Sequence, residues 1–431
     1  MDNFLKRYLK GDYVIWMVYF TLLIISVVEM FSASSQFVPK SGIMTKLIEH
    51  AVHLGLGFIL LLFVHLLDSK TIKMVAYLGL ALSIGLLIYT SIKGLAAADG
   101  GTRWILVVGF QFQPSEVAKL SLIIVVANWI DRAQNPEYQK KTFVYMALII
   151  SLICGLILTE NLSTSLLLFG VIILMMFIGS ISFKRIMIFG GIIIGAVLLI
   201  FLVVNLIPKE KFMEDNTKEN KTFVEKTLYK FKRVYIWNER IAAFVDGSKD
   251  DDLKYTINDE NRQKQHAQIA IARGGAFGVM PGNSIQRNRI PEVSNDFIFA
   301  IIVEELGMLG GGIVIFLYLV LLFRAGKIAF KTETVYPSIL VTGMALMIVI
   351  QALIHIGVAV GIGPVTGQPL PLISRGGTSI LVNSVYFGII LGVSRSIANK
   401  ENAQTLTDET ETTTETPEET NLTQEPITQE L

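Results

Sequence analysis

Residues 297–323 read FIFAIIVEELGMLGGGIVIFLYLVLLF, an apolar run whose only charged residues are two adjacent glutamates. A transmembrane helix needs about 20 predominantly apolar residues. Lipid offers the backbone no hydrogen bonds, so such a run must be helical, whereas a barrel strand would alternate over about 10 residues. Nine more blocks have this character: Val14–Phe31, His50–Leu67, Ile72–Ile92, Val117–Ile130, Phe143–Leu158, Leu162–Ile178, Ile186–Ile207, Pro337–Ile362 and Ile380–Ile397. The sequence predicts an all-α polytopic integral membrane protein with about ten transmembrane helices.

The composition excludes an ordinary soluble enzyme. The 431 residues are 52% hydrophobic and 17% charged, with a mean hydropathy of +0.55. Soluble domains carry about 25% charged residues. Cys154 is the one cysteine in the sequence, which excludes intramolecular disulfides and thiolate metal clusters.

The connecting segments predict the orientation and the domain boundaries. Every second short loop is rich in Lys and Arg, as are the segments that flank the first and last blocks. Positive charge marks the cytoplasmic side, so both termini are expected there. We expect a cytoplasmic N-terminus (1–13) and a transmembrane domain (14–398). A large extracytoplasmic loop (208–295) lies between helices 7 and 8, and a disordered acidic cytoplasmic tail (399–431) follows.

Charged residues stand at the start of two spans. Residues 113–119 read QPSEVAK, so Glu116 and Lys119 share a helix face and can form an ion pair. Asp296 directly precedes the eighth span. Each feature has two interpretations: helix-end stabilisation, or a functional site, with Asp296 as a general base at the outer interface. Glu304 and Glu305 lie deeper, and at least one of them is expected to pair with a cation from another helix.

The segment between the ninth and tenth spans is an irregular apolar loop. Residues 363–379 read GPVTGQPLPLISRGGTS, with three prolines and four glycines. Non-helical chain at membrane depth is tolerated where protein buries it or it lines a cavity. We therefore expect a re-entrant turn over a substrate cavity, with a plain external loop as the alternative. Ser374 and the N–H groups of Gly376 and Gly377 are candidate donors to an anionic group.

Two other patterns argue against common cofactors. Residues 273–284 read RGGAFGVMPGNS, which lacks the Gly-Lys-Ser/Thr of a P-loop, so the glycines are read as points of close backbone approach or a tight turn. The histidines form no clear metal site: His50, His53 and His65 lie in or beside the second span, and His355 is alone in the ninth. They are expected to be buried, neutral and hydrogen-bonded. Neither a nucleotide nor haem is expected.

The ordered set of motifs resembles the shape, elongation, division and sporulation (SEDS) family, the FtsW and RodA proteins. Four stretches carry the resemblance, within a match over about residues 10–398: 101–105, 113–119, 295–307 and 363–379. The resemblance implies a SEDS/GT-C-like bundle that polymerises lipid II into glycan strands with inversion, together with a class B penicillin-binding protein and other divisome proteins. It implies a bacterial inner-membrane location, at the division septum, and no nucleic-acid partner.

The resemblance also assigns roles residue by residue. Asp296 matches the essential acid, the proposed general base, and a divalent cation (Mg²⁺ or Mn²⁺) is a plausible cofactor. The implied substrate-binding residues are Arg103, Glu116, Lys119, Ser374, Arg375, Gly376, Gly377 and Ser379, and Pro371 belongs to the same signature.

This sequence departs from the family pattern before the sixth span, where residues 160–165 read ENLSTS without the Pro or Asp often found there. Any role of that Asp is therefore in doubt here. The final loop, with Arg375 and Leu372, resembles the division branch more than the elongation branch. Three alternatives stay open: the elongation paralogue, a lipid II flippase and a scaffold. The Asp296 position at the outer surface and the lack of a visible inverted repeat favour the enzyme over the flippase.

Overall fold

The computed structural model describes residues 10–34, 40–96, 104–107, 110–206, 237, 241, 262–290 and 295–414. Within these ranges, ten long helices coincide with the ten predicted apolar blocks. They are α2 (Tyr13–Ser34), α3 (Lys40–Leu66), α4 (Ser69–Ala96), α5 (Pro114–Arg132), α6 (Gln139–Glu160), α7 (Leu162–Ile178), α8 (Phe183–Asn205), α14 (Ile298–Phe330), α15 (Val335–Val360) and α16 (Gly377–Thr414). Eight of these described helices are long and apolar enough to cross a membrane. The other two are α7, a shorter apolar helix, and α5, whose first turns are charged and largely buried.

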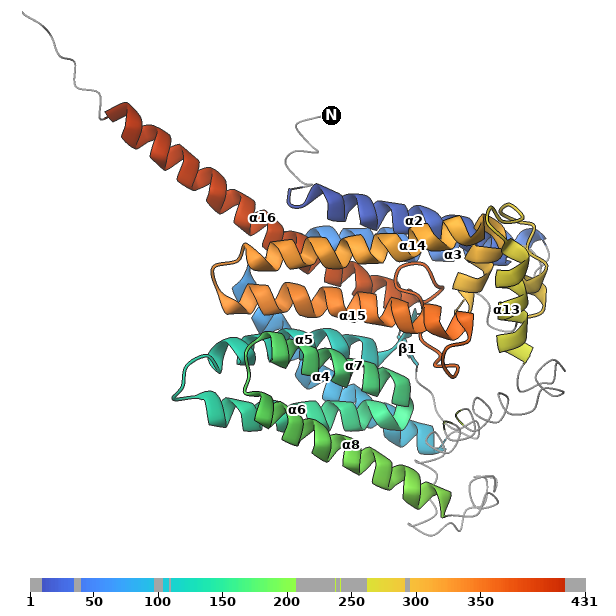
Figure 1. Ribbon diagram of the computed structural model, residues 1–431, viewed down its shortest axis with the longest axis horizontal. Helices are drawn as coiled ribbons and strands as arrows, with labels where there is room; N and C mark the ends of the chain where they lie inside the picture. Colours follow the sequence, from blue (N-terminus) through green and yellow to red (C-terminus); the bar gives the residue numbers. More distant parts are fainter. Residues whose placement is uncertain are drawn as a thin grey trace, which may run out of the picture.

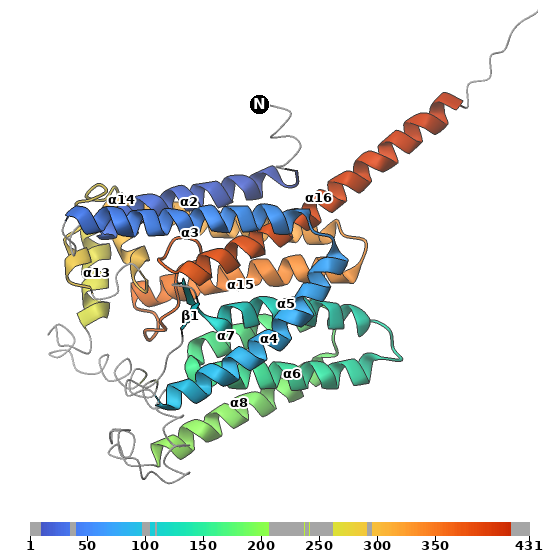
Figure 2. The same cartoon turned by 180° about the vertical axis from the view of Figure 1, so that it is seen from behind.

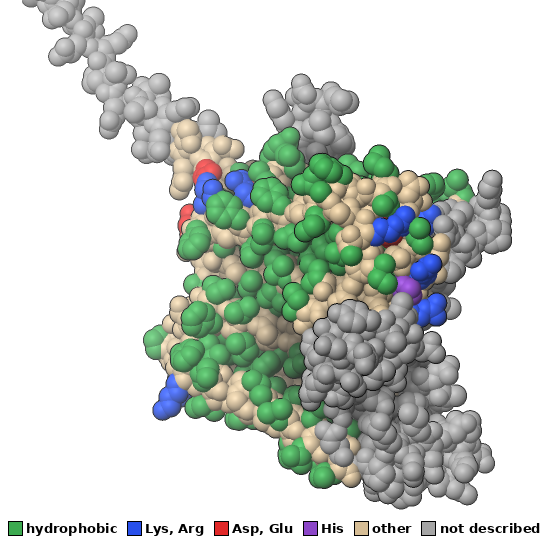
Figure 3. Space-filling view, turned by 45° about the vertical axis from the view of Figure 1, so that its right-hand side comes forward, with side chains coloured by type: hydrophobic (Ala, Val, Ile, Leu, Met, Phe, Trp, Pro, Cys, Tyr) green, Lys and Arg blue, Asp and Glu red, His purple; other side chains and the backbone are tan. Residues whose placement is uncertain are grey.

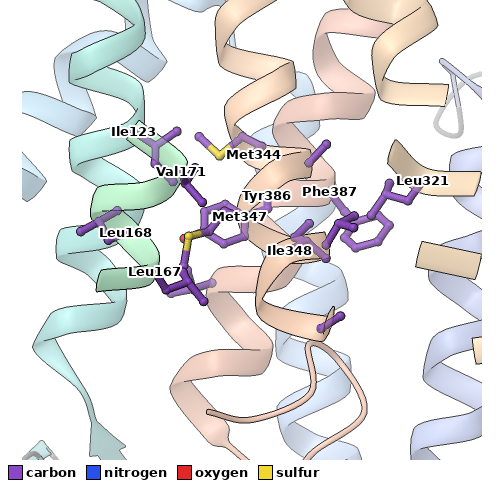
Figure 4. Packing of buried hydrophobic residues seen from close by; sticks show 14 of the residues in the cluster. Ile123, Leu167, Leu168, Val171, Leu321, Met344, Met347, Ile348, Tyr386 and Phe387 are labelled. Carbon is purple, nitrogen blue, oxygen red and sulfur yellow. The ribbon is translucent and has the colours of Figure 1, made fainter. Parts of the chain in front are cut away.

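The long helices lie side by side, with α15 and α16 at the centre (Figures 1 and 2). The most apolar window is 72% buried in α15 and 78% in α16, but only 11% in α8, which therefore lies at the periphery. α3 packs along α16, α14 along α15 and α4 along α5. Figure 4 shows Met344, Met347 and Ile348 of α15, all fully buried, packed between side chains of α5 and α7 and the rings of Tyr386 and Phe387 on α16.

The outer surface of the bundle is apolar over its middle. Side chains such as Ile59, Phe63 and Leu198 are each more than 60% exposed, which would be costly in water and is favourable against lipid tails. Figure 3 shows this apolar surface in green, with the Lys and Arg side chains gathered toward the two ends of the helices. The chain is a multi-pass membrane protein.

Shorter elements occupy one end of the bundle. α13 (Arg262–Gly274) lies across the ends of α14 and α15 and is followed by the 3₁₀ turn η1 (Gln286–Asn288). A two-stranded antiparallel hairpin, β1 (Ile105–Val107) with β2 (Phe110–Phe112), precedes α5 and was not expected. We call this the α13 end, and the opposite end, where α2 begins and α16 leaves the bundle, the tail end (Figure 1).

The predicted boundary of the acidic tail needs correction. We expected disorder from residue 399, but α16 continues to Thr414 (Figure 1). The reason is local: residues 399–414 contain no Gly or Pro that would end the helix. Lys400 and Glu401 at its start pair with Glu333 (2.7 Å) and Lys331 (3.1 Å). Residues 415–431 lie outside the described residues, as does the large loop apart from Trp237, Ile241, 262–290 and 295.

Candidate functional site

The loop between α15 and α16 turns back into the protein at the α13 end. Leu370, Leu372, Ile373 and Ser374 are each no more than 2% exposed, so the re-entrant turn is confirmed and a plain external loop is excluded. The turn is held by Ile373 and Ser374, whose backbone N–H groups donate to the Leu370 carbonyl at 3.2 and 2.9 Å. Leu372 has φ 63°, a left-handed conformation that a non-glycine residue adopts at a cost of about 1–2 kcal/mol. The surrounding structure therefore holds this turn in one conformation.

Ser374 ties this loop to the segment that carries Asp296. Its hydroxyl donates to the Asn295 carbonyl at 2.8 Å and accepts from the Leu370 N–H at 2.8 Å. We expected this hydroxyl to donate to an anionic ligand; its single proton is instead used to position residue 295. The Asp296 carboxylate lies against the same loop, because a Cβ added at Gly367 would be 3.7 Å from its Oδ2.

Asp296 is partly exposed, and it is not the N-cap of α14. The N-cap residue is Phe297, which makes no side-chain capping bond. Asp296 therefore stands one residue before the N-cap, and both interpretations of its carboxylate, helix-end stabilisation and general base, stay predictions. The carboxylate is held beside the buried loop, where a ligand could reach it.

Glu116 and Lys119 form the predicted ion pair in the first turns of α5, with Nζ 2.8 Å from Oε1. Lys119 is fully buried, and its ammonium also donates to Gln351 Oε1 at 3.4 Å. The Gln351 amide in turn donates to the Pro369 carbonyl at 2.9 Å. The pair is therefore connected to the loop through Gln351. Direct contact of Glu116 or Lys119 with a substrate stays a prediction.

Polar residues of α7 and α15 complete the support of the loop. Asn161 caps α7, accepting from the N–H groups of residues 163 and 164, and Ser163 donates to the Thr366 carbonyl at 3.1 Å. Gln368 donates to the Thr164 hydroxyl at 2.6 Å, and its own carbonyl lies 2.8 Å from His355 Nδ1. His355 and His50 are buried and hydrogen-bonded, as expected, whereas neither ring nitrogen of the buried His65 has a hydrogen-bond partner among the described residues. The sequence analysis did not identify Gln351 or Gln368 as site residues. The signal for Gln351 is its position one helical turn before His355 in an otherwise apolar span.

The start of α16 carries the remaining candidates. The Arg375 guanidinium is 38% exposed and lies 3.2 Å from the exposed carboxylate of Glu49, so it remains open to ligands. Gly377 packs against a ring, since an added Cβ would lie 2.5 Å from His53 Nε2. Ser379 is buried and accepts from Asn383 at 3.1 Å. Gly376 is partly exposed beside the first turn of α16, whose N–H groups have no acceptor within the helix. Arg103 lies outside the described residues.

α14 is interrupted at Gly307, which we expected to be helical. Gly307 has φ 73° and ψ −179°. The Gly-rich segment after α13 fills the gap: the Gly275 and Ala276 carbonyls accept from the N–H groups of residues 308 and 309 at 2.9 and 3.2 Å. The N–H groups of residues 279 and 280 donate to the carbonyls of residues 304 and 305 at 3.0 and 2.9 Å. Close backbone approach, the predicted role of these glycines, is confirmed: an added Cβ at Gly278 would be 2.2 Å from the residue 305 carbonyl.

The two glutamates before this break have the cationic partners that we expected. Glu304 lies 2.7 Å from Arg273 Nη1 of α13 and also accepts from the Ser284 hydroxyl. Glu305 lies 3.7 Å from Arg287 Nη1 and accepts from the Gly282 N–H at 3.0 Å. Both carboxylates are fully buried. Through these bonds the two carboxylates attach the Gly-rich segment to the part of α14 that precedes Gly307, in addition to the backbone hydrogen bonds described above.

The arrangement holds a partly exposed carboxylate, Asp296, against the loop 363–376, and Arg375 follows Ser374 in the same loop. A metal site built from the side chains of the described residues alone does not fit. Within the described residues there is no group of three or more His, Cys, Asp or Glu that could hold a metal ion, and Glu116 is already paired with Lys119. The described residues therefore supply no complete donor set for the expected Mg²⁺ or Mn²⁺, which stays a prediction.

Comparisons with known proteins agree with this architecture. A family model described as "Cell cycle protein", which covers FtsW, RodA and SpoVE, matches residues 12–399. Stage V sporulation protein E of Bacillus subtilis (strain 168) is 30% identical over 349 residues, which span 79% of this chain and 84% of that protein. The probable peptidoglycan glycosyltransferase FtsW of Enterococcus hirae is 28% identical over 405 residues, covering 92% and 95% of the two chains.

Solved structures share the fold at lower identity. RodA of Thermus thermophilus superposes with a TM-score of 0.59 at 21% identity, covering 90% of this chain and 98% of that one. A chain in a structure described as "Structural coordination of polymerization and crosslinking by a peptidoglycan synthase complex" gives a TM-score of 0.65 at 23% identity, with the same coverage. The arrangement of helices is therefore that of these multi-pass proteins.

Proposed function

The chain belongs to the FtsW, RodA and SpoVE family of cell cycle proteins, and from this premise we propose that it is a peptidoglycan glycosyltransferase that polymerises lipid II during cell division. The names of several relatives, among them the FtsW proteins of Enterococcus hirae and Burkholderia thailandensis, support the activity. The observation that carries the proposal is the position of Asp296, a partly exposed carboxylate held against the buried loop 363–376.

In the proposed reaction, the Asp296 carboxylate accepts the proton of the acceptor sugar's 4-hydroxyl. The oxygen attacks the anomeric carbon of the donor as the bond from that carbon to the pyrophosphate oxygen breaks. The polyprenyl pyrophosphate leaves with the bonding electron pair, and the anomeric centre is inverted in this single displacement. Arg375 and the first-turn N–H groups of α16 supply positive charge for the departing pyrophosphate.

The support network has a separate role in this proposal. Ser374 lies in the loop and donates to the Asn295 carbonyl, and Gln351 donates to the loop at Pro369. The pair Glu116–Lys119 contacts Gln351 through the Lys119 ammonium, and in this proposal these side chains act as positioning residues. A displacement of about 1 Å at a reacting group can lower a rate about 10²-fold, which is why a rigid loop matters.

The cellular setting is part of the same proposal. The protein lies in the bacterial inner membrane with both termini cytoplasmic, which is supported by the basic loops at the tail end. It acts at the division septum with a class B penicillin-binding protein and other divisome proteins. The FtsW names of the relatives and the shared fold with a chain of a peptidoglycan synthase complex support this assignment.

The test compares the wild type with Asp296→Asn, each purified with and without a class B partner and given labelled lipid II. Glycan ladders from the wild type but not from Asp296→Asn are expected. Asp68→Asn is the matched control, because Asp68 is an exposed carboxylate at the tail end. Ladders from Asp296→Asn would exclude Asp296 as the general base. No ladder from any sample, together with lipid II movement across vesicle membranes, would favour the flippase.

The same assay tests the cation. Reactions run in EDTA, in Mg²⁺ and in Mn²⁺ show whether polymerisation needs a divalent ion. Polymerisation that is lost in EDTA and restored by Mg²⁺ or Mn²⁺ would show that it does.

A further inference from the structure

A second site lies at the tail end, far along the helices from Asp296. A cavity of about 440 Å³ opens between the start of α2, the end of α14 and the part of α16 near residue 398. Its charged lining residues are Asp12, Arg324, Lys327, Lys331 and Glu401. Three cations and two carboxylates leave this cavity with a net positive charge.

One of the three cations is already neutralised. The Arg324 guanidinium is paired with Asp12, with Nε 3.0 and 3.2 Å from the two carboxylate oxygens. Asp12 also caps α2, because its Oδ1 accepts hydrogen bonds from the N–H groups of Val14 and Ile15 at 3.0 and 3.1 Å. This pair forms a rigid, neutral wall of the cavity.

The other two cations remain available. Lys327 makes no ion pair with any described residue, and its ammonium lies 4.6 Å from the centroid of the Phe323 ring. Lys331 pairs with Glu401 at 3.1 Å, but both side chains are more than half exposed. An exposed pair of this kind contributes about 0–1 kcal/mol, so Lys331 can exchange its partner for a stronger anion. Ser394 adds a hydroxyl to the same lining.

The surroundings of the cavity indicate the type of anion. Large apolar side chains stand exposed around its mouth, with Tyr13 at 73%, Phe323 at 63% and Phe330 at 93%. The apolar span of α2 begins at Tyr13, so the cavity lies at the depth where acyl chains meet headgroups. A soluble anion would use the lysines only, whereas a lipid would also cover the exposed rings.

We propose that this cavity binds the phosphodiester headgroup of an acidic phospholipid from the adjoining leaflet, with Lys327 and Lys331 as its cationic contacts. Basic pockets between transmembrane helices bind such headgroups, and each lysine near the surface is worth about fivefold in affinity. The site is separate from the proposed catalytic centre and does not depend on the glycosyltransferase assignment.

The test uses the full-length protein, purified and delipidated in a neutral detergent. Native mass spectrometry then counts adducts with short-chain phosphatidylglycerol, with short-chain phosphatidylcholine and with inorganic phosphate. We expect phosphatidylglycerol to bind preferentially, Lys327→Gln to weaken it about fivefold and the double variant with Lys331→Gln to weaken it further.

Lys140→Gln with Lys141→Gln is the matched control, since both lysines are exposed in a basic loop that is also at the tail end but outside the cavity. Unchanged binding in the cavity double variant, or an equal loss in the control, would overturn the proposal. Inorganic phosphate that binds as tightly as phosphatidylglycerol would overturn the lipid as the source of the anion.

Discussion

The interruption of α14 makes a sharp prediction about one glycine. At Gly307, φ 73° with ψ −179° is a conformation that is essentially restricted to glycine, and a side chain there costs about 1–3 kcal/mol. An added Cβ would also lie 2.3 Å from the Ala276 carbonyl oxygen and 2.5 Å from the Gly278 nitrogen. Backbone cannot move aside as a flexible side chain can, so overpacking adds about 1–3 kcal/mol. Gly307→Ala is therefore expected to lower the free energy of unfolding by about 2–6 kcal/mol.

Substitutions at two further glycines separate the cost of the backbone conformation from the cost of overpacking. Gly275 has φ 51° with no atom within 4 Å of an added Cβ, so Gly275→Ala tests the conformational cost alone, about 1–2 kcal/mol. Gly312 is helical, with nothing within 4 Å, so Gly312→Ala is the matched control within α14 and should stabilise by about 0.5–1 kcal/mol.

The assay titrates each purified variant in mild detergent with sodium dodecyl sulfate and follows helix content by circular dichroism. The expected order of stability is Gly312→Ala, wild type, Gly275→Ala and then Gly307→Ala. If Gly307→Ala is as stable as Gly312→Ala, the backbone interlock between α14 and the Gly-rich segment does not exist as described.

Five other substitutions, two of them controls, test the contacts of Glu304, of the loop and of α7. Arg273→Gln leaves the buried Glu304 carboxylate without its ion pair and should cost about 2 kcal/mol in the same titration, and no loss would contradict the pairing. Gln351→Leu removes a donor to the loop and should lower both stability, by about 1–3 kcal/mol, and glycan synthesis. Gln134→Leu, which loses bonds to two carbonyls at the tail end, should lower stability alone, so equal loss of activity would refute a positioning role. Asn161→Ala should cost about 1 kcal/mol through the lost cap of α7, and Asn161→Asp should retain it; equal effects would exclude capping.

The helices could be predicted because each one depends on its own residues. An apolar run in lipid has one way to bond its backbone, and Glu116 and Lys119 meet because three residues separate them on a helix. The break at Gly307 could not be predicted in this way. Its neighbours are apolar and helical in pattern, and the bonds that replace those of the helix come from residues 275–280, a separate segment.

In the candidate site, too, the features that depend on local residues could be predicted, and those that depend on distant residues could not. Asp296 and the loop 363–379 stand out as local patterns, whereas the use of the Ser374 hydroxyl depends on the Asn295 carbonyl, which is distant in sequence. The hairpin at 105–112 has strands of three residues, too short for a pattern to show. The composition of residues 399–414 suggested disorder. The helix α16 continues through them because they contain no Gly or Pro that would end it.

The extension of α16 has a consequence for how the acidic end of the chain meets other molecules. From Glu401 to Thr414 the helix is about 20 Å long at 1.5 Å per residue. At physiological ionic strength, charges are screened beyond about 8 Å. The helix therefore acts as a spacer that leaves the bundle (Figure 1): its Thr414 end lies further from Glu401 than screened charges interact, so charges at its two ends act independently of each other.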